Sequence, residues 1–149
     1  MEKRVTFSLI TRYMQEIYSI HTSASPEKIW HIWSDVKNWH KWEPSIIDAD
    51  IKGSFSKDAE GFLQPENWPR TRIRISSCED LFSYTVNASF PFAKMYIRRL
   101  IGYDNNKSII TNEVWMEGPL SGFWWRLVGK KYKQMLPQVM DRFRKLAEN

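Results

Sequence analysis

The pattern that most constrains this fold is a long amphipathic helix near the C-terminal end of the chain, predicted from Ser121 to Glu148. At about 100° per residue, its apolar side chains gather into one sector. That sector comprises Trp125, Val128, Tyr132, Met135, Leu136, Val139, Met140, Phe143, Leu146 and Ala147. Pro137 falls on the polar side, and because proline removes one helical hydrogen bond, we predict a bend or an interruption there. A bend with the proline outward would let the helix curve around a sheet.

The segments before this helix have the character of β-strands. We predict a first strand over about 13–22, and six more over about 46–53, 61–65, 70–78, 81–90, 94–104 and 107–116. Two short helices lie between the first and second strands. Ser25-Pro26-Glu27 is a typical helix start, and Trp39 and Trp42 share one face of a second helix, which Pro44 ends. This order predicts an α+β fold, with an antiparallel sheet and its helices on one face.

The composition is that of one globular domain, which we expect to span residues 1–149 with a loosely ordered leader over 1–10. Eight tryptophans, eight phenylalanines and six tyrosines supply a large apolar core. Cys78 is the single cysteine, so no intramolecular disulfide can form. No apolar stretch is long enough for a signal peptide or a membrane span, and we expect a cytoplasmic protein. The net charge of +5 is too mild to select a partner.

Two hairpins indicate which side chains share a face of the sheet. A two-residue turn at Glu79-Asp80 would place Ile75 opposite Tyr84, Ile73 opposite Val86 and Ser77 opposite Phe82, all on one apolar face. The other face would carry a row of arginines, Arg70, Arg72 and Arg74. Alternating arginines on an exposed strand are ordinary surface chemistry, and we expect no nucleic-acid partner.

The second hairpin concerns the one arginine that we expect among apolar residues. A two-residue turn at Asn105-Asn106 pairs Met95 with Met116, Ile97 with Val114, Arg99 with Asn112 and, on the opposite face, Arg98 with Glu113. A three-residue turn would instead put Glu113 on the side of Arg99. A buried Arg99 would be a clamp for a carboxylate, enolate or phenolate, whereas a register error would leave it in solvent.

The sequence resembles the START-related helix-grip superfamily, in particular its polyketide cyclase/dehydrase-like branch. The resemblance covers residues 13–148 and is carried by Ala24-Ser25-Pro26-Glu27-Lys28-Ile29-Trp30, Trp39-His40-Lys41-Trp42-Glu43-Pro44, Ile51-Lys52-Gly53-Ser54-Phe55 and Glu117-Gly118-Pro119-Leu120. It implies a curved antiparallel sheet of about seven strands around a long C-terminal helix. It also implies an internal cavity for a hydrophobic or amphipathic ligand, as in the aromatase/cyclases, lipid carriers and plant hormone receptors of the superfamily.

Motifs for other chemistry are missing from the sequence. The three histidines have no metal-binding spacing, and neither a phosphate loop nor a dinucleotide fingerprint occurs, so we predict no metal and no cofactor. Phe123, Trp124 and Leu127 lie outside the apolar sector of the helix, beside Arg126 and two lysines. They would make a transient membrane-surface contact, a homodimer interface or local packing.

Three hypotheses for function follow. The first is a binding protein or carrier for a small lipid-like or aromatic molecule, held in a cavity lined by Trp39, Trp42, Phe62, Tyr84, Val86, Met95, Ile97, Arg99, Asn112 and Met135. The second is a polyketide cyclase or dehydratase, in which Arg99 or Tyr84 stabilises an enolate in the same cavity. The third is an interaction protein with a filled core.

Overall fold

The structure is a computed structural model that describes residues 15–149. The predicted leader and the first residues of the predicted first strand therefore lie outside the described residues. The elements in chain order are β1 (Gln15–Thr22), α2 (Pro26–Ser34), η2 (Val36–Lys41), β2 (Ile46–Ile51), β3 (Glu60–Pro65), β4 (Thr71–Glu79), β5 (Ser83–Phe90), β6 (Ala93–Asp104), β7 (Lys107–Glu117), α3 (Ser121–Trp124), η3 (Trp125–Gly129) and α4 (Lys130–Glu148).

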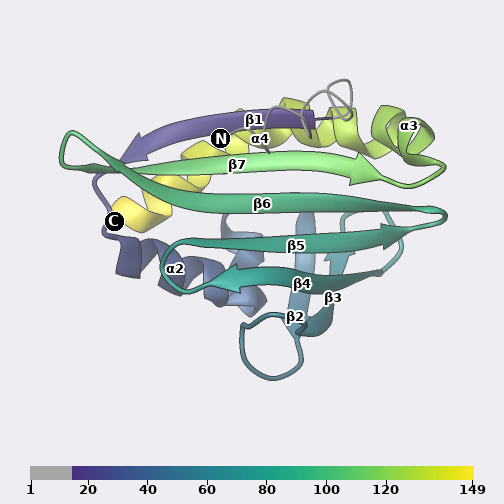
Figure 1. Ribbon diagram of the computed structural model, residues 1–149, viewed down its shortest axis with the longest axis horizontal. Coiled ribbons are helices and arrows are strands. Elements are labelled where there is room, and N and C mark those ends of the chain that lie inside the picture. The colour runs from purple at the N-terminus through teal and green to yellow at the C-terminus, as the bar shows by residue number, and fades with distance from the viewer. Residues whose placement is uncertain (1–14) are drawn as a thin grey trace.

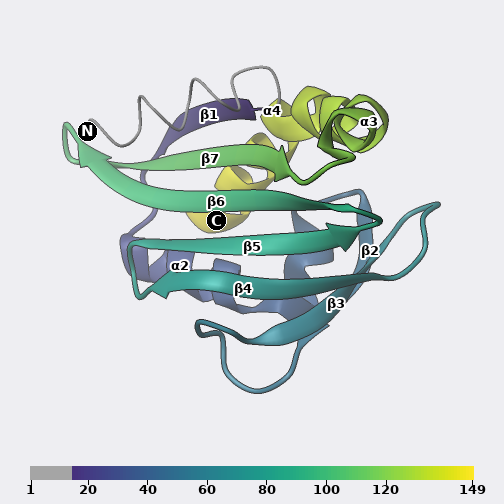
Figure 2. The same cartoon turned by 45° about the vertical axis from the view of Figure 1, so that its right-hand side comes forward.

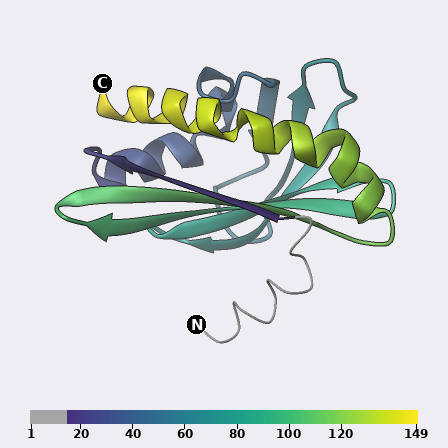
Figure 3. The same ribbon diagram turned by 90° about the horizontal axis from the view of Figure 1, so that it is seen from above.

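The seven strands form one antiparallel sheet in the order β1-β7-β6-β5-β4-β3-β2 (Figure 1). Seen from above, α4 and α2 lie on the same side of this sheet (Figure 3). We call that side the inner face. The predicted α+β helix-grip architecture is confirmed, with one long C-terminal helix held against a curved sheet.

The first short helix begins where the sequence predicts, and the second, predicted to hold Trp39 and Trp42, ends at Lys41. Ser25 caps α2, and its side chain accepts a hydrogen bond from the backbone N–H of Lys28 at 3.2 Å, while Pro26 occupies the first turn. The second helix, η2, is a 3₁₀ helix that buries Trp39, and Trp42 follows at its end. These two elements and the residue after η2 bring four indoles into the core, those of Trp30, Trp33, Trp39 and Trp42.

Of the two alternatives predicted at Pro137, the interruption does not occur. Pro137 lies inside α4, which continues past it without interruption to Glu148. Pro137 is exposed, so water can satisfy the carbonyl group that loses its helical partner. The irregular turn is instead η3, a π-helical segment in which Gly129 packs against Trp125. A Cβ on Gly129 would lie 2.2 Å from Cε3 of that indole, so the packing requires glycine there.

The register of the first hairpin differs from the prediction. Ile75 pairs with Val86, Ile73 with Ala88, and Cys78 with Tyr84, with a bulge between Ile75 and Ser77. The turn is longer than two residues, because Leu81 adopts a left-handed φ of 62° and Phe82 lies in the turn, half exposed. The longer turn and the bulge together shift the partners of Ile73 and Ile75 by two positions along β5, which keeps the same side chains on the same face. The apolar face is therefore retained, except that Ser77 moves to the outer face and Phe82 leaves the sheet.

The second hairpin has the predicted register throughout. Asn105 and Asn106 adopt φ values of 49° and 64°, which a two-residue turn of type I′ requires. Ile97 pairs with Val114, Arg99 with Asn112, and Arg98 with Glu113. Arg98 donates hydrogen bonds to Glu113 on the outer face, and the two side chains form an ion pair there.

The core beneath the inner face contains two clusters of buried apolar residues. One gathers the residues of α2 and η2 with Tyr84 and Phe143. Most of its ring pairs meet edge to face, as Trp42 and Phe143 do with centroids 5.1 Å apart, whereas Trp39 and Tyr84 are stacked. The other lies nearer to α3 and comprises Ala93, Met95, Val114, Met116, Trp125 and Leu136.

Candidate functional site

Arg99 lies on the inner face with 2% of its surface exposed. Its Nη2 is 2.6 Å from Oε1 of Glu43, a carboxylate that reaches it from the end of η2. The guanidinium also donates to Oδ1 of Asn112 at 2.8 Å, to the hydroxyl of Tyr132 at 3.2 Å, and to the hydroxyl of Tyr84. The protein itself thus neutralises the charge and satisfies most of its donors.

Aromatic rings surround the same guanidinium. Its carbon lies 4.8 Å from the ring centroid of Trp42, 5.8 Å from that of Trp39 and 5.7 Å from that of Tyr84. These distances are within the range of cation–π attraction. Two buried donors beside this cluster, Nε1 of Trp42 and Nδ2 of Asn112, have no hydrogen-bond partner within the described chain.

Burial controls the ionisation of this cluster. It raises the pKa of the Tyr84 phenol to about 12, against smaller opposing effects of Arg99, and it also raises the pKa of Tyr132. Burial alone would lower the pKa of Arg99, but the oxygens of Tyr84, Tyr132 and Glu43 outweigh burial and raise the pKa. Both phenols therefore remain neutral at pH 7 while Arg99 remains charged.

A second site lies where the sheet divides. The ladder between β4 and β5 ends at the pair Ile73–Ala88, whereas β3 stays paired with β4 as far as Thr71, and β5 with β6 as far as Phe90. In Figure 1 this is the end of β4 and β5 that lies away from the turn joining them. Figure 2 brings this end forward, with α3 beside it, and we call it the α3 end of the sheet.

The split between β4 and β5 contains a partly open cavity of about 460 Å³. It is lined by Trp68, Pro69, Arg70, Thr71, Arg72, Ser89, Phe90, Pro91 and Trp124. The ring of Trp124 joins the others, with centroids 6.0 Å from Trp68 and 5.1 Å from Phe90. Its indole N–H donates to the carbonyl of Pro91 at 2.8 Å, which holds the ring at the cavity. Because Phe90 and Trp124 also pack against the second core cluster, the cavity borders the interior of the molecule.

The fold recurs in solved structures of low sequence identity. A START superfamily protein from Mycobacterium smegmatis aligns over 89% of this chain and 99% of its own, with a TM-score of 0.65 and 16% identity. The Aha1 dimer from Colwellia psychrerythraea aligns over 90% and 96%, with a TM-score of 0.68 and 12% identity. Norcoclaurine synthase from Thalictrum flavum aligns over 89% and 84%, with a TM-score of 0.65 and 11% identity.

The chain has the START-related helix-grip fold. No protein-family model matches the sequence, and no curated protein matches it significantly. At these identities the likeness describes the fold alone.

Within this helix-grip fold, the residues predicted to line an internal cavity occupy two different faces. Tyr84, Val86, Met95, Ile97, Arg99 and Asn112 share the inner face of the sheet, and Met135 of α4 is partly buried against the first core cluster. Phe62 pairs with Arg72 on the outer face, where Arg70 lies over its ring. This corrects the placement of Phe62, which faces away from the grip.

The two tryptophans predicted to line the cavity lie in the core. Trp39 and Trp42 are 2% and 1% exposed, and they pack against each other with centroids 6.1 Å apart. They fill the space beside Arg99. None of the ten predicted residues lines the cavity in the split, and every residue that does line it was missed.

One sequence signal marks this cavity. Pro69 precedes β4 and Pro91 follows β5, and neither can donate a backbone hydrogen bond to a neighbouring strand.

Among the described residues, no three His, Cys, Asp or Glu side chains come together as metal ligands would. In the same part of the chain, no helix is long and apolar enough to cross a membrane.

Proposed function

We propose that the protein binds a small hydrophobic or amphipathic molecule, as a binding protein or carrier, in the cavity of the split between β4 and β5. The volume of about 460 Å³ lies in the range of small-molecule sites, roughly 300–1,000 Å³. Three aromatic rings, those of Trp68, Phe90 and Trp124, supply apolar contact area. The hydroxyl of Ser89 can donate a hydrogen bond to a ligand, whereas that of Thr71 donates to the carbonyl of Pro69 and can only accept one. This combination in one cavity is the observation that carries the proposal.

The surroundings of Arg99 favour binding over catalysis. A polyketide cyclase or dehydratase that used Arg99 or Tyr84 would need one of them free to meet an enolate. Arg99 already donates to four protein groups, and Tyr84 is fully buried among Trp30, Trp33 and Trp39. Turnover of a poly-β-ketone substrate that disappears in Tyr84→Phe would support the enzymatic alternative instead.

The binding proposal is tested by filling the cavity. Ser89 lines it from β5, so Ser89→Phe should place a ring inside without disturbing the core. Ser77→Phe is the matched control, because Ser77 is exposed on β4 and does not line the cavity. Titration calorimetry with decanol, a neutral apolar probe, should show binding to the parent and to Ser77→Phe, and a loss of more than about tenfold in Ser89→Phe.

Two results would contradict this proposal. One is decanol binding that Ser89→Phe leaves unchanged, since the probe would then sit elsewhere. The other is no binding to the parent, together with no rise in melting temperature across a library of apolar compounds. That second result would favour the third hypothesis, an interaction protein with a filled core.

We further propose that the α3 end makes transient contact with an anionic membrane surface. Exposed apolar side chains gather around the cavity there, namely Phe92, Phe123, Leu127, Leu120 and Trp68, which are 74%, 55%, 44%, 42% and 41% exposed. Lys94 and Arg126 stand beside them, with Glu117 opposite Lys94 in the sheet. The turns at the opposite end carry three acidic residues, Glu79, Asp80 and Asp104, and one lysine, Lys107. Apolar side chains flanked by cations fit a membrane that holds anionic lipid. A homodimer through this end is the competing outcome.

A further inference from the structure

Two arginines at the cavity differ from their neighbours in the sheet. Arg74 is paired with Asp58 at 2.5 Å, Arg98 with Glu113, and Arg99 with Glu43. Arg70 and Arg72 form no ion pair with any residue from 15 to 149. Within this row of three arginines, Asp58 thus neutralises the charge of Arg74, whereas the charges of Arg70 and Arg72 remain at the cavity.

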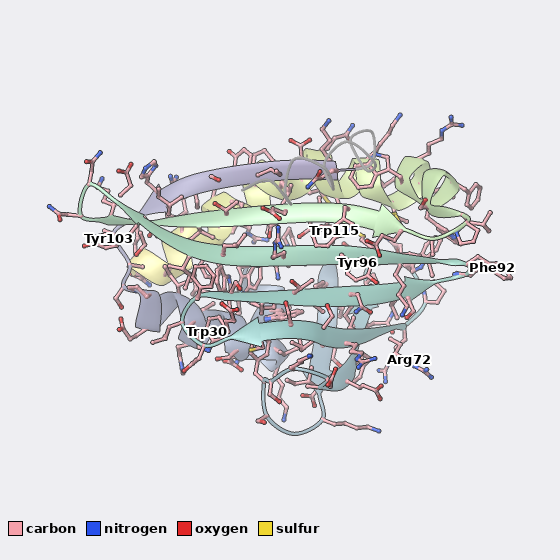
Figure 4. The ribbon with its side chains drawn as sticks, viewed as in Figure 1. Trp30, Arg72, Phe92, Tyr96, Tyr103 and Trp115 are labelled. Carbon is pink, nitrogen blue, oxygen red and sulfur yellow. The ribbon has the colours of Figure 1, made fainter. Side chains whose placement is uncertain are left out.

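Arg70 is held in place without losing its donors. Its guanidinium carbon lies 3.9 Å from the ring centroid of Phe62, on the outer face of β3. Stacking on a ring engages the flat face of a guanidinium and leaves its N–H groups, which lie in the plane, available to an acceptor. Arg72 lies on the same face, opposite Phe62, at the end of the sheet that also carries Phe92 (Figure 4).

The rest of the lining leaves the positive charge uncompensated. The nine lining residues include two arginines and no acidic side chain. A cavity lined by charges of one sign favours a ligand of the opposite sign, and guanidinium groups bind carboxylate and phosphate oxygens with two parallel hydrogen bonds. The aromatic part of the lining, with Trp68 and Trp124, requires an apolar body on the same molecule.

We infer that the ligand is an anionic amphiphile, whose carboxylate or phosphate group is bound by Arg70 and Arg72 while its apolar body rests on Trp68, Phe90 and Trp124. This inference rests on the proposed function of the same cavity. It adds the chemical class of the ligand, since a neutral lipid or a free aromatic hydrocarbon would leave both cations unused.

Calorimetric titration of the full chain with three probes of equal chain length tests this inference. Decanoate and monodecyl phosphate carry the anion, and decanol does not. Both anions should bind at least about tenfold more tightly than decanol at low salt, and raising the salt should weaken only the anions. The stronger of the two anions identifies the headgroup as a carboxylate or a phosphate.

Variants assign the effect to the two arginines. The double variant Arg70→Gln/Arg72→Gln should bind both anions no more tightly than decanol, and the double variant Arg70→Lys/Arg72→Lys should recover part of the preference. Arg74→Gln is the control on the same strand and should leave all three affinities unchanged. All three positions are exposed, so the variants are expected to fold.

Each contrary outcome has a distinct meaning. Equal binding of decanol and the anions would overturn anion recognition and leave the proposed function standing. A loss of anion binding in Arg74→Gln as large as in the double glutamine variant would also overturn it, because general surface charge would explain the preference. Failure of all three probes to bind would overturn the proposed function and this inference together.

Discussion

The ion pair of Arg99 and Glu43 gives the sharpest test of whether Arg99 acts in folding or in ligand recognition. Their side chains are 2% and 4% exposed, and the two atoms are 2.6 Å apart. Removing one partner of such a pair leaves a buried charge, which typically costs about 3–5 kcal/mol. Glu43→Leu should therefore lower the free energy of unfolding by that amount. Glu43→Gln keeps an acceptor oxygen for Arg99 and should cost less.

Urea denaturation and thermal melting measure these differences. For a domain of this size, a loss of about 3–5 kcal/mol lowers the melting temperature by roughly 6–20 °C. The double variant Glu43→Leu/Arg99→Met removes both charges, although Tyr84 and Asn112 lose a hydrogen-bond partner. Its free energy of unfolding should therefore fall by less than the sum of the losses in the two single variants.

Ligand affinity separates the two roles. Neither Arg99 nor Glu43 lines the cavity in the split, so the folded fraction of Glu43→Gln should bind decanol and decanoate as the parent does. A variant Arg99→Met that retained the parent stability but lost ligand binding would refute the reasoning, because Arg99 would then be a ligand clamp.

Three further predictions concern other parts of the molecule. In urea denaturation, Gly129→Ala should lower the free energy of unfolding by about 1–3 kcal/mol, because its Cβ would collide with Trp125. Gly122→Ala, whose Cβ would have no atom within 4 Å, should raise it by about 0.5–1 kcal/mol. Equal effects of the two variants would contradict the packing at η3. The raised pKa of Tyr84 makes the free energy of unfolding depend on pH: its stabilising effect is complete below pH 10, and up to about 2–3 kcal/mol is lost as the pH rises to 12, because the phenol ionises first in the unfolded chain. In that window the free energy of unfolding of Tyr84→Phe should fall less steeply than that of the parent. Parallel curves would refute the raised pKa of Tyr84. In co-sedimentation, the double variant Phe92→Asn/Phe123→Ser should bind vesicles of phosphatidylcholine and phosphatidylglycerol about tenfold more weakly than the parent. Tyr103→Ser, at the opposite end of the sheet (Figure 4), is the control and should bind as the parent does. Equal losses would argue against membrane contact at the α3 end.

The parts of the fold that were predictable from sequence are those fixed by local chemistry. Asn105 and Asn106 tolerate the left-handed conformation that a two-residue turn needs, so the hairpin register was readable, and with it the place of Arg99 opposite Asn112. Ser25 and Pro26 likewise fixed the start of α2.

The parts that failed depend on tertiary structure. The left-handed Leu81 and the bulge beside Ser77 have no residue-level signal, since neither position holds glycine or asparagine. Glu43 meets Arg99 across 56 positions of sequence, which no local pattern encodes. The split between β4 and β5 depends on where the hydrogen-bonded pairing of these two strands ends. In the sequence, the flanking prolines Pro69 and Pro91 indicate only that loops lie there.

The most direct measurement of the central claim is the set of indole N–H signals in a ¹H–¹⁵N correlation spectrum during titration with decanoate. Trp68 and Trp124 line the cavity, whereas Trp39 and Trp42 are enclosed in the core beside Arg99. Ligand binding in the split predicts that the signals of Trp68 and Trp124 move to saturation while those of Trp39 and Trp42 stay in place. Movement of Trp39 and Trp42 with Trp68 and Trp124 unchanged would contradict it.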